Sequence, residues 1–188
     1  MLNNFKNYLF QKRARKFLSK IPRERRFASY EKAKNVLILF ESDYSEKNPL
    51  VRKMLKTLKQ DGKKVSAWGF IDKKVITTSI LPDFRVLNYK QTDLSERPDA
   101  AFIRELEGLE FDLMIDLSLK PILPLQYLAV HANASCKAGI LRSDLPIYDF
   151  ILDVESVLTS DEFVEESMDE KYLFNQIIFY LKSIQTKD

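Results

Sequence analysis

The sequence predicts an α/β fold: a three-layer Rossmann-like domain with a mostly parallel sheet of five or six strands. Residues 111–117 form a short, mostly apolar run closed by Ser118, as in a strand buried on both faces of a parallel sheet. Pro121 and Pro124 then permit a helix to begin, and residues 136–140 predict the next strand. Strand, crossover helix and strand form a right-handed βαβ unit, whose two faces need helices to cover them.

The first half of the chain shows the same alternation of strand and helix. Residues 36–40 are apolar throughout and predict the first strand. Apolar residues at helical spacing after Pro49 predict a helix that closes at Gly62. Residues 64–70 predict the second strand. This β-α-β opening is typical of a doubly wound fold.

The second half of the chain completes the expected sheet. Two segments, 75–80 and 84–89, are rich in β-forming residues, and we favour 84–89 as the third strand. The expected strand order is 3-2-1-4-5, with a sixth strand as an addition. The other predicted elements are helices over 98–107 and 123–132, a short sixth strand over 148–154, and an amphipathic final helix with apolar residues from 173 to 184.

Composition excludes several classes of protein. A single cysteine rules out an intramolecular disulfide framework, and a single histidine rules out a His-rich metal site. The chain has no apolar run of the roughly 20 residues that a membrane span needs, and its N-terminus lacks the apolar core of a signal peptide. We therefore expect a cytoplasmic protein, with no metal and no cofactor.

Charge is distributed unevenly along the chain, although the net charge is only +3. Residues 1–30 hold nine Lys and Arg and one acid, whereas residues 151–170 hold eight acids and no base. We expect residues 1–33 to form a basic N-terminal helix and connector, and 34–188 to form a single α/β domain. The helix would present an apolar stripe to that domain (Leu2, Phe5, Leu9, Phe10, Phe17 and Leu18) and a basic face to solvent.

The basic N-terminal segment is the strongest functional signal, and it suggests an anionic partner. RNA or the ribosome is the first candidate, and an anionic membrane surface is another. Aromatic residues interleave with the charges, as they do on nucleic-acid platforms. The alternative is that the acidic segment 155–170 pairs with these bases within the chain. The residues expected to contact the partner are Lys12, Arg13, Arg15, Lys16, Arg23, Arg25 and Arg26.

The carboxyl edge of the predicted sheet is a second candidate site, because ligands of open α/β sheets bind there. Polar residues follow three of the strands at this edge, and together they are suited to a small-molecule ligand with phosphate or hydroxyl groups. Solvation of ordinary loops explains the same polarity. The residues in question are Ser42, Asp43, Ser118, Lys120 and Arg142.

No catalytic motif supports an enzyme. The first strand is followed by Glu41 and Ser42, not by the spaced glycines of a dinucleotide site. Asp116 is expected to find a structural partner, because a carboxylate at the end of an apolar strand needs one. His131 and Cys136 are expected at the opposite edge of the sheet, as a helix-capping imidazole and a packed thiol.

Two family resemblances follow from these residues. The basic N-terminal helix and residues 68–74, 111–118, 138–139 and 148–152 resemble a family of small bacterial proteins of unknown function, found mainly in Bacteroidota. That resemblance implies no activity.

The second resemblance covers residues 111–118 and 128–140, which are similar to the late part of the N-terminal Rossmann-like domain of heptosyltransferase-type glycosyltransferases. Such enzymes bind their nucleotide sugar with a second Rossmann domain, and 188 residues leave no room for one. The resemblance therefore implies a half-domain without the donor site.

Overall fold

A six-stranded, all-parallel sheet forms the middle layer of the protein. The computed structural model describes residues 2–20, 23–27, 29–43, 47–72, 84–140, 144–153 and 169–184. The strand order is β3-β2-β1-β4-β5-β6, which confirms the predicted order and the sixth strand. The strands are β1 (Asn35–Glu41), β2 (Lys64–Ile71), β3 (Phe84–Asn88), β4 (Glu110–Asp116), β5 (Asn133–Ile140) and β6 (Phe150–Leu152).

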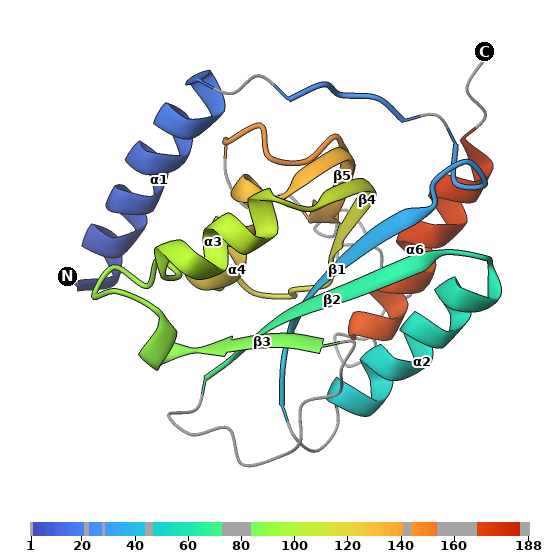
Figure 1. Cartoon of the computed structure of the whole chain (residues 1–188), viewed down its shortest axis with the longest axis horizontal. Coiled ribbons are helices and arrows are strands. Elements are labelled where there is room, and N and C mark those ends of the chain that lie inside the picture. Colours follow the sequence, from blue (N-terminus) through green and yellow to red (C-terminus); the bar gives the residue numbers. More distant parts are fainter. Residues whose placement is uncertain are drawn as a thin grey trace, which may run out of the picture.

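Helices cover both faces of the sheet (Figure 1). Helices α2 (Lys47–Gln60) and α6 (Glu170–Ser183) pack on one face, where their apolar side chains share a core with the strands. Helices α3 (Ala100–Glu107) and α4 (Leu123–His131) pack on the other face. Helix α1 (Leu2–Lys20) lies outside α4 and joins the same core.

The central strand β1 shows why the sheet is buried on both faces. Val36, Ile38 and Phe40 contribute to the core under α2 and α6, and Leu37 and Leu39 contribute to the core under α4. All five residues are fully buried. Burial of an apolar side chain contributes about 1.5–3 kcal/mol. The strand is apolar at every position from 36 to 40 because helices cover both faces of the sheet.

Some element boundaries differ from those predicted. Strand β5 begins at Asn133, three residues before the expected start, and extends its pairing with β4. Helix α3 begins at Ala100 because the side chain of Asp99 caps it by accepting from the backbone N–H of Phe102. The segment 75–80 and most of the acidic segment 155–170 lie outside the described residues.

None of the described helices is both long enough and apolar enough to cross a bilayer. The longest of them is α1, with 19 residues, and lysine and arginine side chains interrupt it throughout.

Candidate anion-binding site

Helix α1 is attached to α4 by a small apolar contact. Phe10 and Ala14 are buried there. The Phe10 ring meets the Tyr127 ring edge to face, with centroids 4.9 Å apart. Further along, the ring of Phe17 lies with its centroid 4.1 Å from that of the His131 imidazole, at the end of α4. These contacts fix which side of α1 faces the protein.

Polar anchors add to this contact. Nζ of Lys6 lies 2.7 Å from Oε1 of Glu96. One of the guanidinium nitrogens of Arg13 donates to Oγ of Ser95 at 2.6 Å. Both acceptors belong to a tight turn over residues 93–97, which we call the anchor turn. Helix α1 is thus held at two points, seven residues apart, on the same turn.

The anchor turn is itself organised by one carboxylate. Oδ1 of Asp93 accepts from the backbone N–H of Ser95 at 2.7 Å, from its hydroxyl at 2.5 Å and from the backbone N–H of Arg97 at 3.1 Å. Burial acts to raise the pKa of Asp93, but the hydrogen bonds from Ser95 and Arg97 lower it overall. Glu96 adopts a left-handed backbone conformation, with φ of 62°. The hydrogen bonds of the turn therefore fix the backbone position of Arg97, from which its side chain extends.

The connector after α1 is fixed by arginine side chains. Arg23 donates to the carbonyl oxygen of Ala134 at 2.9 Å, and its other terminal nitrogen lies 2.6 Å from the carboxylate of Asp149. Arg25 donates to the carbonyl oxygen of Pro146 at 3.1 Å. Both guanidinium groups, which the sequence suggested for an anionic partner, have partners within the chain. Their positive charges hold the connector against β5 and the segment before β6.

A different set of cations lies on the solvent side of α1. Phe5, Tyr8, Lys12 and Arg15 follow one another at helical spacing and are all exposed; we call them the outer face. Phe5 is 57% exposed and Tyr8 is 61% exposed. The expectation that Phe5 packs on the domain is wrong, because five residues place it about 140° around the helix from the buried Phe10. The side chain of Arg26, in the connector, is exposed as well.

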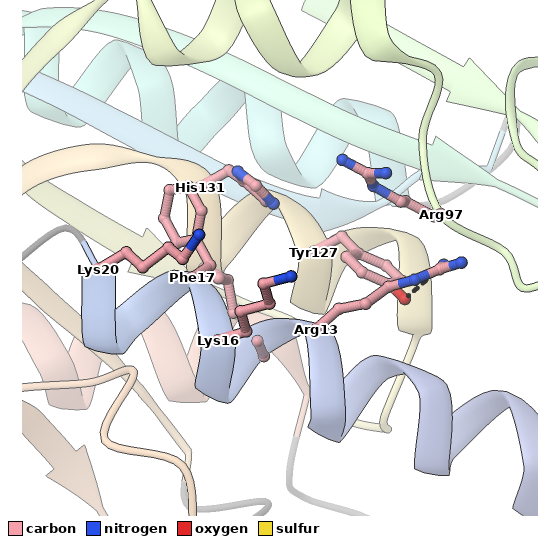
Figure 2. A pocket seen from close by; sticks show the side chains of 9 residues that line it. Arg13, Lys16, Phe17, Lys20, Arg97, Tyr127 and His131 are labelled. Atoms are coloured by element: carbon pink, nitrogen blue, oxygen red, sulfur yellow. Dashed lines mark hydrogen bonds between the residues drawn. The ribbon is translucent and has the colours of Figure 1, made fainter.

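A basic groove lies between α1, the anchor turn and the end of α4 (Figure 2). Its volume is about 340 Å³. None of the described residues that line it is Asp or Glu. Figure 2 shows nitrogen-bearing side chains around the opening, from all three elements. They belong to Arg13, Lys16, Lys20, Arg97 and His131.

The cations of the basic groove differ in how they are held. Arg13 has partners: besides Ser95, it donates to the hydroxyl of Tyr127 at 3.4 Å, and Asp93 lies 3.7 Å away. In contrast, the structure gives the side chains of Lys16, Lys20 and Arg97 no hydrogen bond or ion pair with any described residue. Like charges at close range repel one another, so a counter-charge in the groove would stabilise this arrangement.

His131 forms the inner end of the groove. Its Nδ1 lies 2.7 Å from Oε1 of Glu107, on α3. Burial lowers the pKa of His131, and the neighbouring charges of Arg97 and Lys137 act in the same direction, while Glu107 opposes them. The imidazole therefore tends to be neutral at physiological pH, with Glu107 fixing its orientation. The imidazole was expected to cap α4, but its hydrogen-bond partner is Glu107 on α3. Cys136 is a buried free thiol in β5, as expected.

The residues expected at the carboxyl edge do not come together in one cavity. Ser118 is buried, and its hydroxyl donates to Oδ1 of Asp116 at 2.5 Å. Ser42 is also buried. Lys120 is exposed, and its Nζ lies 2.9 Å from a carboxylate oxygen of Glu41. Asp43 is half-buried, and Arg142 lies outside the described residues.

The carboxyl edge nevertheless contains a cavity of about 330 Å³. It lies where the strand order reverses between β1 and β4, and among the described residues Glu41 and Lys120, which follow or end the expected strands at this edge, line it. The other polar lining comes from residues that the sequence did not suggest, among them Lys6, Glu96 and Tyr89. Burial, followed by the charges of nearby Asp72 and Glu96, raises the pKa of Tyr89 to about 12.

Asp116 has the structural partners that the sequence led us to expect. Its Oδ1 accepts from the backbone N–H and the hydroxyl of Ser118, and its Oδ2 accepts from the hydroxyl of Tyr148 at 2.5 Å. The ring of Tyr148 lies so close to Gly139 that a Cβ added there would meet it at 2.7 Å. These hydrogen bonds satisfy the buried carboxylate of Asp116, as expected for a residue with a structural role.

Lys137 is a buried cation that sequence reasoning missed. Only 1% of its surface is exposed. Its Nζ donates to the carbonyl oxygens of Ala129 at 2.7 Å and Val130 at 3.2 Å, near the C-terminus of α4. Burial, with the charge of Arg23 acting in the same direction, lowers the pKa of Lys137 to about 7. A lysine in a strand carries no sequence signal for this role, since its acceptors lie on the preceding helix.

The chain belongs to the family of unknown function DUF6913, whose match covers residues 6–184. That match confirms the expected resemblance to a family without an assigned activity. None of the curated proteins matches the sequence.

Proposed function

We propose that this member of the family is a non-enzymatic protein of the bacterial cytoplasm that binds an anionic partner, RNA or the ribosome, through α1. One observation carries the proposal: α1 contains no Asp or Glu, and its outer face presents Lys12 and Arg15 beside the exposed rings of Phe5 and Tyr8. The single described cysteine, Cys136, is a buried free thiol, in keeping with a reducing compartment.

The combination of rings and cations favours single-stranded RNA among anionic partners. Lysine and arginine attract the phosphate backbone and give binding a strong salt dependence. Exposed aromatic rings add stacking, which contributes about 1–3 kcal/mol per base regardless of sequence. On α1, Phe5 and Tyr8 are three residues apart on one face and precede the cations by about one turn. A strand lying along the helix would meet the rings first and the cations next.

Fluorescence anisotropy with a labelled single-stranded RNA tests the proposal. The outer-face variant carries Lys12→Gln and Arg15→Gln. The control variant carries Lys53→Gln and Lys56→Gln, two exposed lysines on α2, on the other face of the sheet. Each pair lowers the net charge by two. Both variants can be compared with the wild type over a salt gradient.

The proposal expects only the outer-face variant to bind more weakly. Each lost phosphate contact should reduce the slope of log K against log salt by about 0.7, so the slope should fall by about 1.4. Phe5→Ala with Tyr8→Ala should weaken binding without changing the slope, because stacking releases no counter-ions. Equal losses in the outer-face and control variants would contradict the proposal, as would binding of anionic lipid vesicles in preference to RNA.

A small-molecule ligand at the carboxyl edge is a second candidate, favoured by the cavity at the β1/β4 reversal. Two ion pairs flank it, Lys6 with Glu96 and Lys120 with Glu41, so polar groups of both signs are available to a ligand. A thermal-shift screen of small polar metabolites tests this. A hit should lose its effect in Lys120→Gln and keep it in the outer-face variant.

A further inference from the structure

Cations converge on the basic groove from two parts of the chain that are distant in sequence. Lys16 and Lys20 are one helical turn apart on α1, so both side chains reach the same side. Arg97 enters from the anchor turn, across the groove from them (Figure 2). Arg13 lies at one end. Among the described residues, none that lines the groove carries a carboxylate.

Two positions that border the groove are held by hydrogen bonds within the protein. Arg13 is held by Ser95 at 2.6 Å, and the backbone of Arg97 is held by Asp93 at 3.1 Å. The donors of Arg97, Lys16 and Lys20 remain without partners among the described residues. An anion that binds in the groove would not have to displace a described partner from these three donor groups.

Size and lining restrict the ligand. About 340 Å³ is enough for a phosphate group with a small attached moiety, and too little for a nucleic-acid duplex. The walls contain the rings of Phe17 and Tyr127, against which the attached group can pack. A phosphate accepts several charge-assisted hydrogen bonds at once, and arginine is suited to bind two of its oxygens together.

From this geometry we infer that the basic groove is a phosphate-binding site, with Lys16, Lys20 and Arg97 as its donors. The site deepens the proposed function, on which it rests in part: the phosphate is either the 5′-terminal phosphate of an RNA strand that lies along α1 or a group on a free phosphorylated metabolite. The shared chemistry is a terminal phosphate, which carries more charge than a phosphodiester within a strand.

Arg97→Gln is the variant that tests the site, because Arg97 lies outside α1 and outside the packed core. Its matched control is Arg104→Gln, at an exposed arginine on α3 whose side chain makes no hydrogen bond or ion pair with the described residues. Circular dichroism checks that both variants are folded. Inorganic pyrophosphate is the first probe, measured by isothermal titration calorimetry at 100 mM salt.

Wild type and Arg104→Gln should bind pyrophosphate alike, and Arg97→Gln should bind it about tenfold more weakly, as expected for the loss of a charge-assisted hydrogen bond. Lys16→Gln with Lys20→Gln should show a loss of the same order or larger. Absence of pyrophosphate binding by the wild type, or equal binding by both arginine variants, would overturn the inference.

Two RNA oligonucleotides, one with a 5′-phosphate and one with a 5′-hydroxyl, distinguish the sources of the phosphate. If the wild type prefers the 5′-phosphate and Arg97→Gln abolishes the preference, the groove receives the end of an RNA strand. If pyrophosphate binds but no such preference exists, the groove serves a free phosphorylated ligand. The outer-face variant separates the two proposals: it should weaken RNA binding and leave pyrophosphate binding unchanged.

Discussion

The hydroxyl of Tyr148 donates to Oδ2 of the buried Asp116 at 2.5 Å, joining the segment before β6 to the end of β4. Tyr148→Phe removes this donor and leaves a carboxylate oxygen buried with one partner fewer. We expect the free energy of unfolding to fall by about 1–3 kcal/mol, the usual cost of an unsatisfied buried group. Urea denaturation measures the loss. Tyr8→Phe is the control, because Tyr8 is 61% exposed, and it should change nothing.

The ring of Tyr148 also packs closely against Gly139, which leads to a second prediction. A Cβ at Gly139 would lie 2.7 Å from the Tyr148 ring, so Gly139→Ala should destabilise the protein by about 1–3 kcal/mol through overpacking. The same substitution should cost much less in a Tyr148→Ala background, where the ring is absent. A double-mutant cycle measures the difference. Additive effects would mean that the strain lies elsewhere.

The buried Lys137 should make the free energy of unfolding depend on pH. The pKa of Lys137 is about 7 in the folded protein and near its ordinary value of 10.5 in the unfolded chain. Between these values the unfolded chain binds a proton that the folded protein does not, so stability should rise with pH, by at most about 1.4 kcal/mol per pH unit. Lys137→Met should remove this contribution, because methionine does not titrate.

Urea denaturation of wild type and Lys137→Met at pH 7, 8 and 9 tests this prediction. The difference between the two proteins isolates Lys137, since other titrating groups are common to both. Buried Cys136, whose pKa burial raises to about 12, is one of them. Lys53→Met, at an exposed position on α2, should show the slope of the wild type. Parallel curves for wild type and Lys137→Met would contradict the prediction.

The buried ring of Phe10 should contribute most of the apolar contact that attaches α1 to α4. Phe10 is buried against Tyr127, whereas Phe5 on the same helix is 57% exposed. Phe10→Ala should destabilise the docked helix by about 3 kcal/mol, within the range for a buried phenylalanine. Phe5→Ala should have no such effect. Hydrogen exchange should be faster across α1 in Phe10→Ala only, with the sheet unchanged; uniform acceleration would mean that α1 and the sheet unfold together.

The sheet was predictable because its signal is local. Apolar runs such as 36–40 and 111–117 predicted buried strands, and the expected strand order followed from the β-α-β opening that is typical of doubly wound folds. The N-terminal helix was predictable as a helix, but its orientation was not. Its buried side includes Ala14, which has little apolar surface to mark it, and its polar anchors depend on the anchor turn, far away in sequence.

The candidate sites were less predictable, for a similar reason. Sequence position placed Ser42 and Ser118 at the carboxyl edge, but it did not indicate that both are buried there. Sequence composition indicated a basic N-terminus, but not that Arg23 uses its charge to fix the connector. Arg97 had no signal at all, because only the fold brings it beside Lys16.

The attachment of α1 also determines an order of folding. Helix α1 precedes α4 in the chain, yet its buried ring packs on Tyr127, and Arg13 reaches the hydroxyl of that residue, 114 residues further along. During translation α1 therefore has no docking surface until α4 has formed. Contacts of such long sequence separation form late because the intervening chain must close first. Helix α1 therefore docks only after α4 has formed, and until then its bases and rings are open to any anion nearby.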